Sequence, residues 1–125
     1  MRGLALYFFV LGVVAAIVGM SWGIQMSATK DHLLAPAHAH LNLLGWVTLA
    51  LFGVYYHVSP AAAQGVLPKL HFALAALGVI AIVPGIVMAV RETGETLAKA
   101  GSFLTLGSML LFLLIVLRNA GREGA

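Results

Sequence analysis

The stretch LLAPAHAHLNLLGWVTLALFGVYYHV, residues 33–58, is long and apolar enough to cross a bilayer as a helix, yet it carries two histidines, His38 and His40. A hydrocarbon core about 30 Å thick needs about 20 apolar residues at a helical rise of about 1.5 Å each. Ionisable side chains at membrane depth are rare, and they usually face a bundle interior or a cofactor. The pair is therefore the strongest candidate for a functional site in this chain.

Three further stretches have the same apolar character. The chain of 125 residues is 62% hydrophobic and 9% charged, which is too apolar for a soluble domain of this length. Continuous apolar runs predict membrane-spanning helices over residues 4–26, 33–58, 67–90 and 100–117. The connecting segments are too short to hold a second domain. We therefore expect one all-α domain, an integral membrane four-helix bundle embedded in the lipid bilayer.

Charge and cysteine content exclude several classes of function. The seven Lys and Arg residues are scattered singly at helix ends, which is typical of membrane anchoring and not of a nucleic-acid partner. The absence of cysteine excludes disulfides, thiolate-held metals, iron–sulfur clusters and the covalent attachment of c-type haem. Any haem in this protein must therefore be bound non-covalently.

The basic residues also predict an orientation. One side of the membrane receives four of them, Arg2, Lys69, Arg118 and Arg122. The other side receives three, Lys30, Arg91 and Lys99, interleaved with acidic residues. Because cytoplasmic loops carry an excess of Lys and Arg, this count favours a multi-pass protein of the bacterial inner membrane with both termini in the cytoplasm. The histidine pair then lies towards the outer side.

Helical geometry separates the two histidines. At about 100° per residue, His38 and His40 project about 200° apart, so they leave the helix on nearly opposite faces. They are not expected to chelate one ion together, and each reaches a different neighbouring space. By contrast, we expect His57 and His71, near the opposite membrane surface, to reach water with their polar tips, and the loop residue His32 to be solvated.

Other residues at the level of the pair supply the groups that haem requires. These are a thioether for iron, a cation for propionates and acceptors that orient a ligand histidine. The candidates are Trp22, Gln25, Met26 and Arg91, together with Asn42, one turn after His38.

Small residues predict close contacts between helices, because helix association in lipid depends on close backbone approach. Gly19 and Gly23 form a G-x-x-x-G step. Further close contacts are expected at Gly45, Gly53, Gly78, Gly101 and Gly107. Pro84 lies well inside the third predicted helix and should kink it unless neighbours satisfy the freed carbonyl.

The order of residues around the pair resembles the tenth helix of the catalytic subunit I of haem–copper oxidases. That helix carries a His-x-His motif, then a glycine, an aromatic exit and a proline, matched here by residues 35–40, Gly45, Tyr55-Tyr56 and Pro60. The oxidases begin the next helix with a His-Phe-led apolar segment interrupted by a proline. Here that segment reads Lys69-Leu70-His71-Phe72-Ala73-Leu74, then Gly78-Val79 and Pro84. The match covers about half of the chain and extends weakly to all four helices, as the last third of that subunit.

The resemblance implies roles for the two histidines. In the family, the first histidine of the motif holds the high-spin haem and the second holds the low-spin haem, in two different pores. These roles would fall on His38 and His40 as ligands of a non-covalent haem b. The oxidases bind copper through histidines on two other helices, which this chain lacks, so we do not expect it to reduce oxygen alone.

Family architecture also implies a homotrimer. The oxidase subunit is a ring of three four-helix arcs, and one arc resembles this chain. In a closed ring of three copies, each pore would receive His38 from one protomer and His40 from the next. The expected function is that of a b-type haem protein for electron transfer or haem handling, with a respiratory-chain partner.

Two other functions agree with the same residues. Imidazoles from several protomers, with Met26 or Asp31, would suit copper or zinc in storage, delivery or oxidase assembly. Alternatively, the chain is a cofactor-free accessory or assembly protein of a respiratory oxidase, whose histidines form only hydrogen bonds.

Overall fold

The computed structural model describes residues 1–123 and contains four long helical spans. The first is α1 (Gly3–Thr29). The second is continuous from Ala35 to Val58 and consists of α2 (Ala35–His40), the π-helix η1 (Leu41–Thr48) and α3 (Leu49–Val58). A short 3₁₀ helix, η2 (Pro60–Ala63), leads to α4 (Leu67–Val90) and α5 (Thr96–Glu123). All four spans are long and apolar enough to cross a membrane. The predicted all-α four-helix membrane bundle is confirmed.

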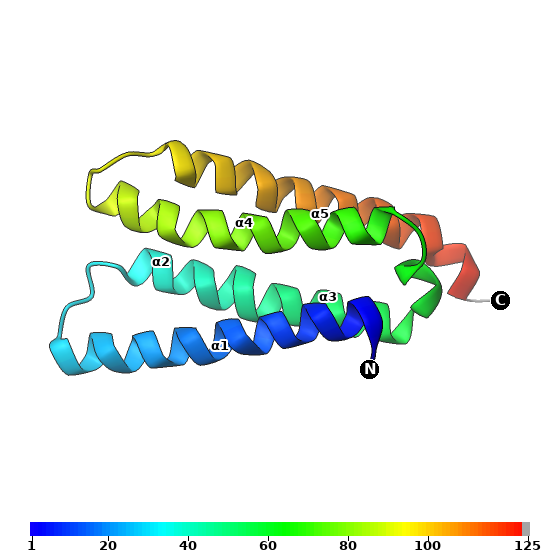
Figure 1. Cartoon of the computed structure of the whole chain (residues 1–125), viewed down its shortest axis with the longest axis horizontal. Helices are drawn as coiled ribbons and strands as arrows, with labels where there is room; N and C mark the ends of the chain where they lie inside the picture. Colours follow the sequence, from blue (N-terminus) through cyan, green and yellow to red (C-terminus); the bar gives the residue numbers. More distant parts are fainter. Residues whose placement is uncertain (124–125) are drawn as a thin grey trace.

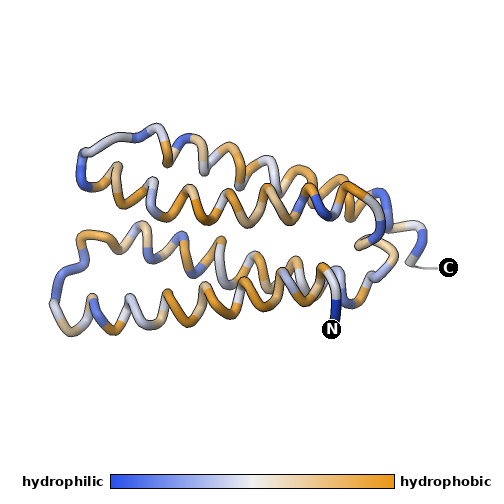
Figure 2. Tube along the Cα trace, in the orientation of Figure 1, coloured by the Kyte–Doolittle hydropathy of each residue, from blue (hydrophilic) through white to orange (hydrophobic). Residues whose placement is uncertain are grey.

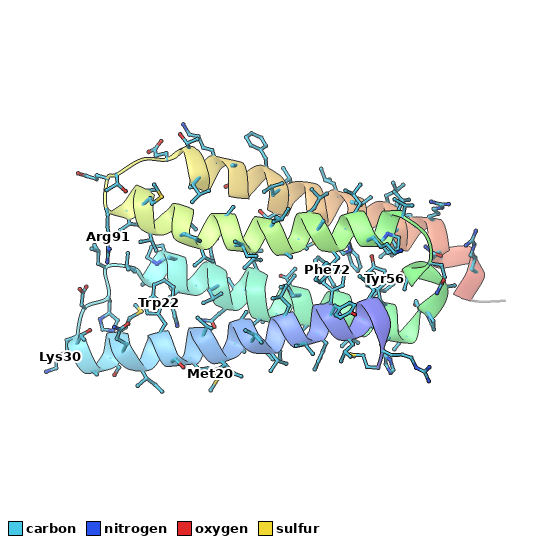
Figure 3. The ribbon with its side chains drawn as sticks, viewed as in Figure 1. Met20, Trp22, Lys30, Tyr56, Phe72 and Arg91 are labelled. Carbon is cyan, nitrogen blue, oxygen red and sulfur yellow. The ribbon has the colours of Figure 1, made fainter. Side chains whose placement is uncertain are left out.

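The spans pair as two antiparallel hairpins (Figure 1). In one hairpin α1 packs on η1 and α3; in the other α4 packs on α5, and α4 joins the two hairpins through its contacts with α2 and η1. Both termini lie at one end of the bundle, and the loops that carry Lys30 and Arg91 lie at the other (Figure 3). Hydrophobic residues cover the helices, and hydrophilic ones gather mainly at the two ends (Figure 2). This distribution is the one that a bilayer imposes.

Helices α1 and α5 extend beyond the predicted apolar runs at the ends that carry Thr29 and Thr96. At these ends hydroxyl groups donate to the carbonyl one turn earlier: Thr29 Oγ1 lies 2.9 Å from Gln25 O and Ser102 Oγ lies 2.8 Å from Ala98 O. Helix α1 ends at Thr29, and the residue that follows it, Lys30, has a left-handed φ of 56°. The helices thus extend past the hydrocarbon region that hydropathy detects.

The second span departs from the uniform α-helix assumed from the sequence. Residues Leu41–Thr48 are π-helical, so their backbone N–H groups bond to carbonyls five residues earlier and each turn is wider. Thr48 Oγ1 follows the same register, donating to Leu43 O over 2.6 Å. His38 and His40 precede this segment, in α2, so their predicted separation is unaffected.

Glycines allow the close helix contacts that were predicted. A Cβ on Gly101 of α5 would lie 2.5 Å from Ile82 N of α4, and one on Gly53 of α3 would lie 2.9 Å from Ala5 O of α1. Neither position has room for alanine. The prediction for Gly107 is wrong, because a Cβ there would meet nothing within 4 Å. Helix α4 runs through Pro84 as one helix.

Candidate functional site

The G-x-x-x-G step of α1 receives polar side chains from the second span. His38 Nε2 lies 2.9 Å from Gly19 O, and Asn42 Nδ2 lies 3.2 Å from the same ring nitrogen. A Cβ on Gly19 would overlap the Asn42 amide, and one on Gly23 would lie 3.2 Å from His38 Nε2. The glycines therefore allow His38 and Asn42 to reach the α1 backbone, a role beyond the helix packing expected of them.

Hydrogen bonding fixes the tautomer of His38. The Gly19 carbonyl can only accept, so Nε2 must carry the proton and donate it. An Nε2–H group cannot accept from Asn42, and the Asn42 amide is better placed with its oxygen towards the ring, an assignment that follows from the bonding network. The nitrogen of His38 left with a free lone pair is Nδ1.

His40 has the opposite tautomer. Its Nδ1 lies 2.8 Å from Pro36 O, one turn earlier on the same helix, so Nδ1 donates and Nε2 carries the free lone pair. His40 is half-buried and forms no hydrogen bond to another helix within residues 1–123, whereas His38 is bonded to α1. The two imidazoles therefore present different nitrogens and make different contacts.

A pocket opens beside His38. It has a volume of about 430 Å³ and is lined by α1 residues including Gly19, Met20 and Gly23, with His38 and Asn42 on the opposite wall. Trp22 meets the His38 ring edge-on, with ring centroids 5.9 Å apart. The pocket thus joins an imidazole to a largely apolar surface.

The other predicted site residues are only partly brought together. Trp22 and Asn42 contact His38. Met26 is buried on α1. The side chains of Gln25 and Arg91 are exposed, and neither has a hydrogen bond or ion pair with the histidines in the described part of the chain. Any contact of these two residues with a cofactor remains a prediction.

Within the described part of one chain, metal ligands do not form a cluster. Among residues 1–123 there is no group of three or more His, Cys, Asp or Glu side chains close enough to hold an ion. The Asp31 carboxylate accepts from the Leu33 backbone amide at 3.0 Å.

The expectation that His71 reaches water is wrong. His71 is 0% exposed and lies among Phe8, Phe52, Tyr56 and Phe112, with the Phe52 ring centroid 4.4 Å away. Its Nδ1 is 2.8 Å from the Tyr56 hydroxyl, and its Nε2 has no partner among the described residues. His57 and His32 are exposed, as predicted.

A sequence signal for this burial exists in α4. The buried positions Pro68, His71, Ala75, Gly78, Ile82 and Gly85 recur every three or four residues. This spacing marks one helix face. His71 lies on that face one turn after the start of α4, so it points into the bundle.

Comparisons with protein-family models, curated proteins and solved structures give no match to this chain. The resemblance to haem–copper oxidase subunit I therefore rests on the order and spacing of residues in the motifs.

Proposed function

We propose that this protein binds haem b non-covalently in the membrane, between protomers, with His38 and His40 as iron ligands. The bond from His40 Nδ1 to the Pro36 carbonyl at 2.8 Å is the observation that carries the proposal. Metal-bound histidines almost always donate their second ring N–H to a carbonyl or carboxylate, which fixes the ring and its tautomer. His40 already has this orientation and leaves Nε2 free.

The surroundings of His38 also fit the group. Its Nε2 donates to Gly19 O, so the ring is oriented in the same way with Nδ1 free. The adjacent pocket of about 430 Å³ is open on one side, as a site shared between two protomers would be. Bound haem would supply one-electron chemistry at its iron. The role of His38 and His40 would be to hold it.

A homotrimer would complete the sites. His38 contacts α1 and His40 does not, so the two residues are suited to different spaces. In a closed ring of three copies, each space would receive one histidine from each of two protomers. On this proposal the protein lies in the bacterial inner membrane with cytoplasmic termini and transfers electrons to or from a respiratory-chain partner, or handles haem.

A second candidate is a cofactor-free accessory protein of a respiratory oxidase. It is favoured by one observation: both imidazoles already donate to backbone carbonyls, which satisfies one N–H group of each ring without a ligand. Copper or zinc binding between protomers is a third outcome that the same experiment tests.

The experiment is a reduced-minus-oxidised absorption spectrum of the detergent-purified protein from haem-replete cells, with elemental analysis and an oligomer mass. We expect a sharp reduced α-band, iron and a trimeric mass. His38→Ala and His40→Ala should lose the band, while His57→Ala, at an exposed histidine near the other membrane surface, should keep it. A folded, colourless trimer supports the accessory function, and bound copper or zinc without porphyrin supports the metal site; either result refutes haem binding.

A further inference from the structure

A second pocket lies at the end of the bundle that carries both termini, far from the histidine pair. It has a volume of about 720 Å³ and is formed by the start of α1, the η2 segment and the first turns of α4. Arg2 and Lys69 lie in its wall, on different spans. The proposed function assigns no role to this pocket.

Among the side chains that the structure describes, no carboxylate lies near the two cations of the pocket. Every acidic side chain that the structure describes, namely Asp31, Glu92 and Glu95, lies at the opposite end of the bundle. Across residues whose side chains are described, the single ion pair joins Lys99 to Glu95. Arg2 and Lys69 therefore face one cavity without a carboxylate partner there, and the pocket favours an anion.

The remaining walls are apolar and aromatic. Tyr7 of α1 and Phe72 of α4 line the pocket with ring centroids 6.4 Å apart (Figure 3 labels Phe72). Tyr56 is also part of the wall, and the bond from its hydroxyl group to buried His71 holds it in place. Aromatic rings of this kind gather at the head-group level of a membrane. An apolar wall next to two cations matches an amphiphile better than a free ion.

We propose that this pocket binds the phosphate head group of an acidic phospholipid, with Arg2 and Lys69 contacting the phosphate and Tyr7 and Phe72 contacting the upper part of the acyl chains. Basic pockets between membrane-spanning helices bind anionic head groups in this way. The site is independent of the histidine pair, so it does not rest on haem binding.

The test is native mass spectrometry of the detergent-purified protein titrated with phosphatidylglycerol and, separately, with phosphatidylcholine. We expect each basic side chain that contacts the head group to contribute about a fivefold factor, and basic side chains farther away to contribute less because solvent ions screen them. The double variant Arg2→Gln/Lys69→Gln should therefore bind phosphatidylglycerol about thirty-fold more weakly. The control Arg118→Gln/Arg122→Gln removes the same charge at the same end from outside this pocket and should change the affinity by less than about threefold.

Two further variants make the result independent of folding. Arg2→Lys/Lys69→Arg keeps both charges and should keep the affinity, while Tyr7→Ser removes a ring that is 64% exposed and should weaken binding without changing the charge. Equal losses in the two glutamine double variants, or equal binding of phosphatidylcholine, would overturn the proposal. Displacement of the lipid by millimolar inorganic phosphate would assign the pocket to a free anion and would also overturn it. The haem spectrum of these variants reports separately on the histidine pair.

Discussion

The buried Tyr56–His71 pair predicts that each single substitution destabilises the protein and that the double substitution does not. Tyr56→Phe keeps the ring but removes the hydroxyl group that lies 2.8 Å from His71 Nδ1. His71 is 0% exposed and its Nε2 has no described partner, so both nitrogens of its ring would then lack a hydrogen bond. A buried polar group left without its partner destabilises a protein by about 1–3 kcal/mol.

His71→Phe leaves the Tyr56 hydroxyl group, on a side chain that is 1% exposed, without this hydrogen-bond partner, so we expect it to destabilise the protein as well. It removes both nitrogens and places a ring of similar shape among Phe8, Phe52 and Phe112, whose centroids lie 4.4–5.2 Å from that of His71. The double variant Tyr56→Phe/His71→Phe replaces both partners by apolar groups, a change that is often nearly neutral or stabilising. We therefore expect a coupling free energy of about 1–3 kcal/mol between the two positions.

The assay is reversible unfolding of the four proteins of this double-mutant cycle in one detergent, followed by circular dichroism. A loss of about 1–3 kcal/mol lowers Tm by several degrees in a chain of this size. The reasoning is refuted if the loss in the double variant equals the sum of the losses in the two single variants. That outcome would show that the two side chains are not coupled through the Tyr56–His71 hydrogen bond.

Three smaller predictions concern glycines at helix contacts and one exposed ion pair. Gly101→Ala should separate the α4–α5 hairpin and lower Tm by several degrees, because its Cβ would lie 2.5 Å from the α4 backbone. The control Gly107→Ala should leave Tm unchanged, because its Cβ would meet nothing within 4 Å. Gly19→Ala should displace Asn42, and it should both lower Tm and remove any haem band. An unchanged haem spectrum in this variant would contradict the placement of the site. Lys99→Ala should change the free energy of unfolding by less than about 0.5 kcal/mol, since its ion pair is exposed.

Length and apolarity decide most of the fold, which explains why the sequence predicted it. The observed spans Ala35–Val58 and Leu67–Val90 agree with the predicted ranges 33–58 and 67–90 within two residues. The ends at Thr29 and Thr96 were missed because hydropathy detects the hydrocarbon region, whereas a helix can continue through polar residues beyond it.

The candidate site was predictable only in part. The angle between His38 and His40 follows from helical geometry, and the small residues at positions 19 and 23 of α1 predicted a close contact with another helix. That the contact would be made by His38 and Asn42 could not be read from the pattern, because it depends on the pairing of two particular helices. The tautomers of the two rings depend on individual carbonyl distances, which no sequence pattern contains.

The π-helical segment Leu41–Thr48 has a consequence for the whole second span. Tyr56 follows His38 by eighteen residues, which in an unbroken α-helix is five complete turns, so the two side chains would lie in one line. The wider π turns rotate the chain by less per residue and offset the two ends of the span. His38 can then bond to α1 while Tyr56 bonds to α4. The segment thus sets how far one end of the span is rotated about the helix axis relative to the other end. Shortening it by one residue would change this rotation, and the chain would then lose one of these two bonds.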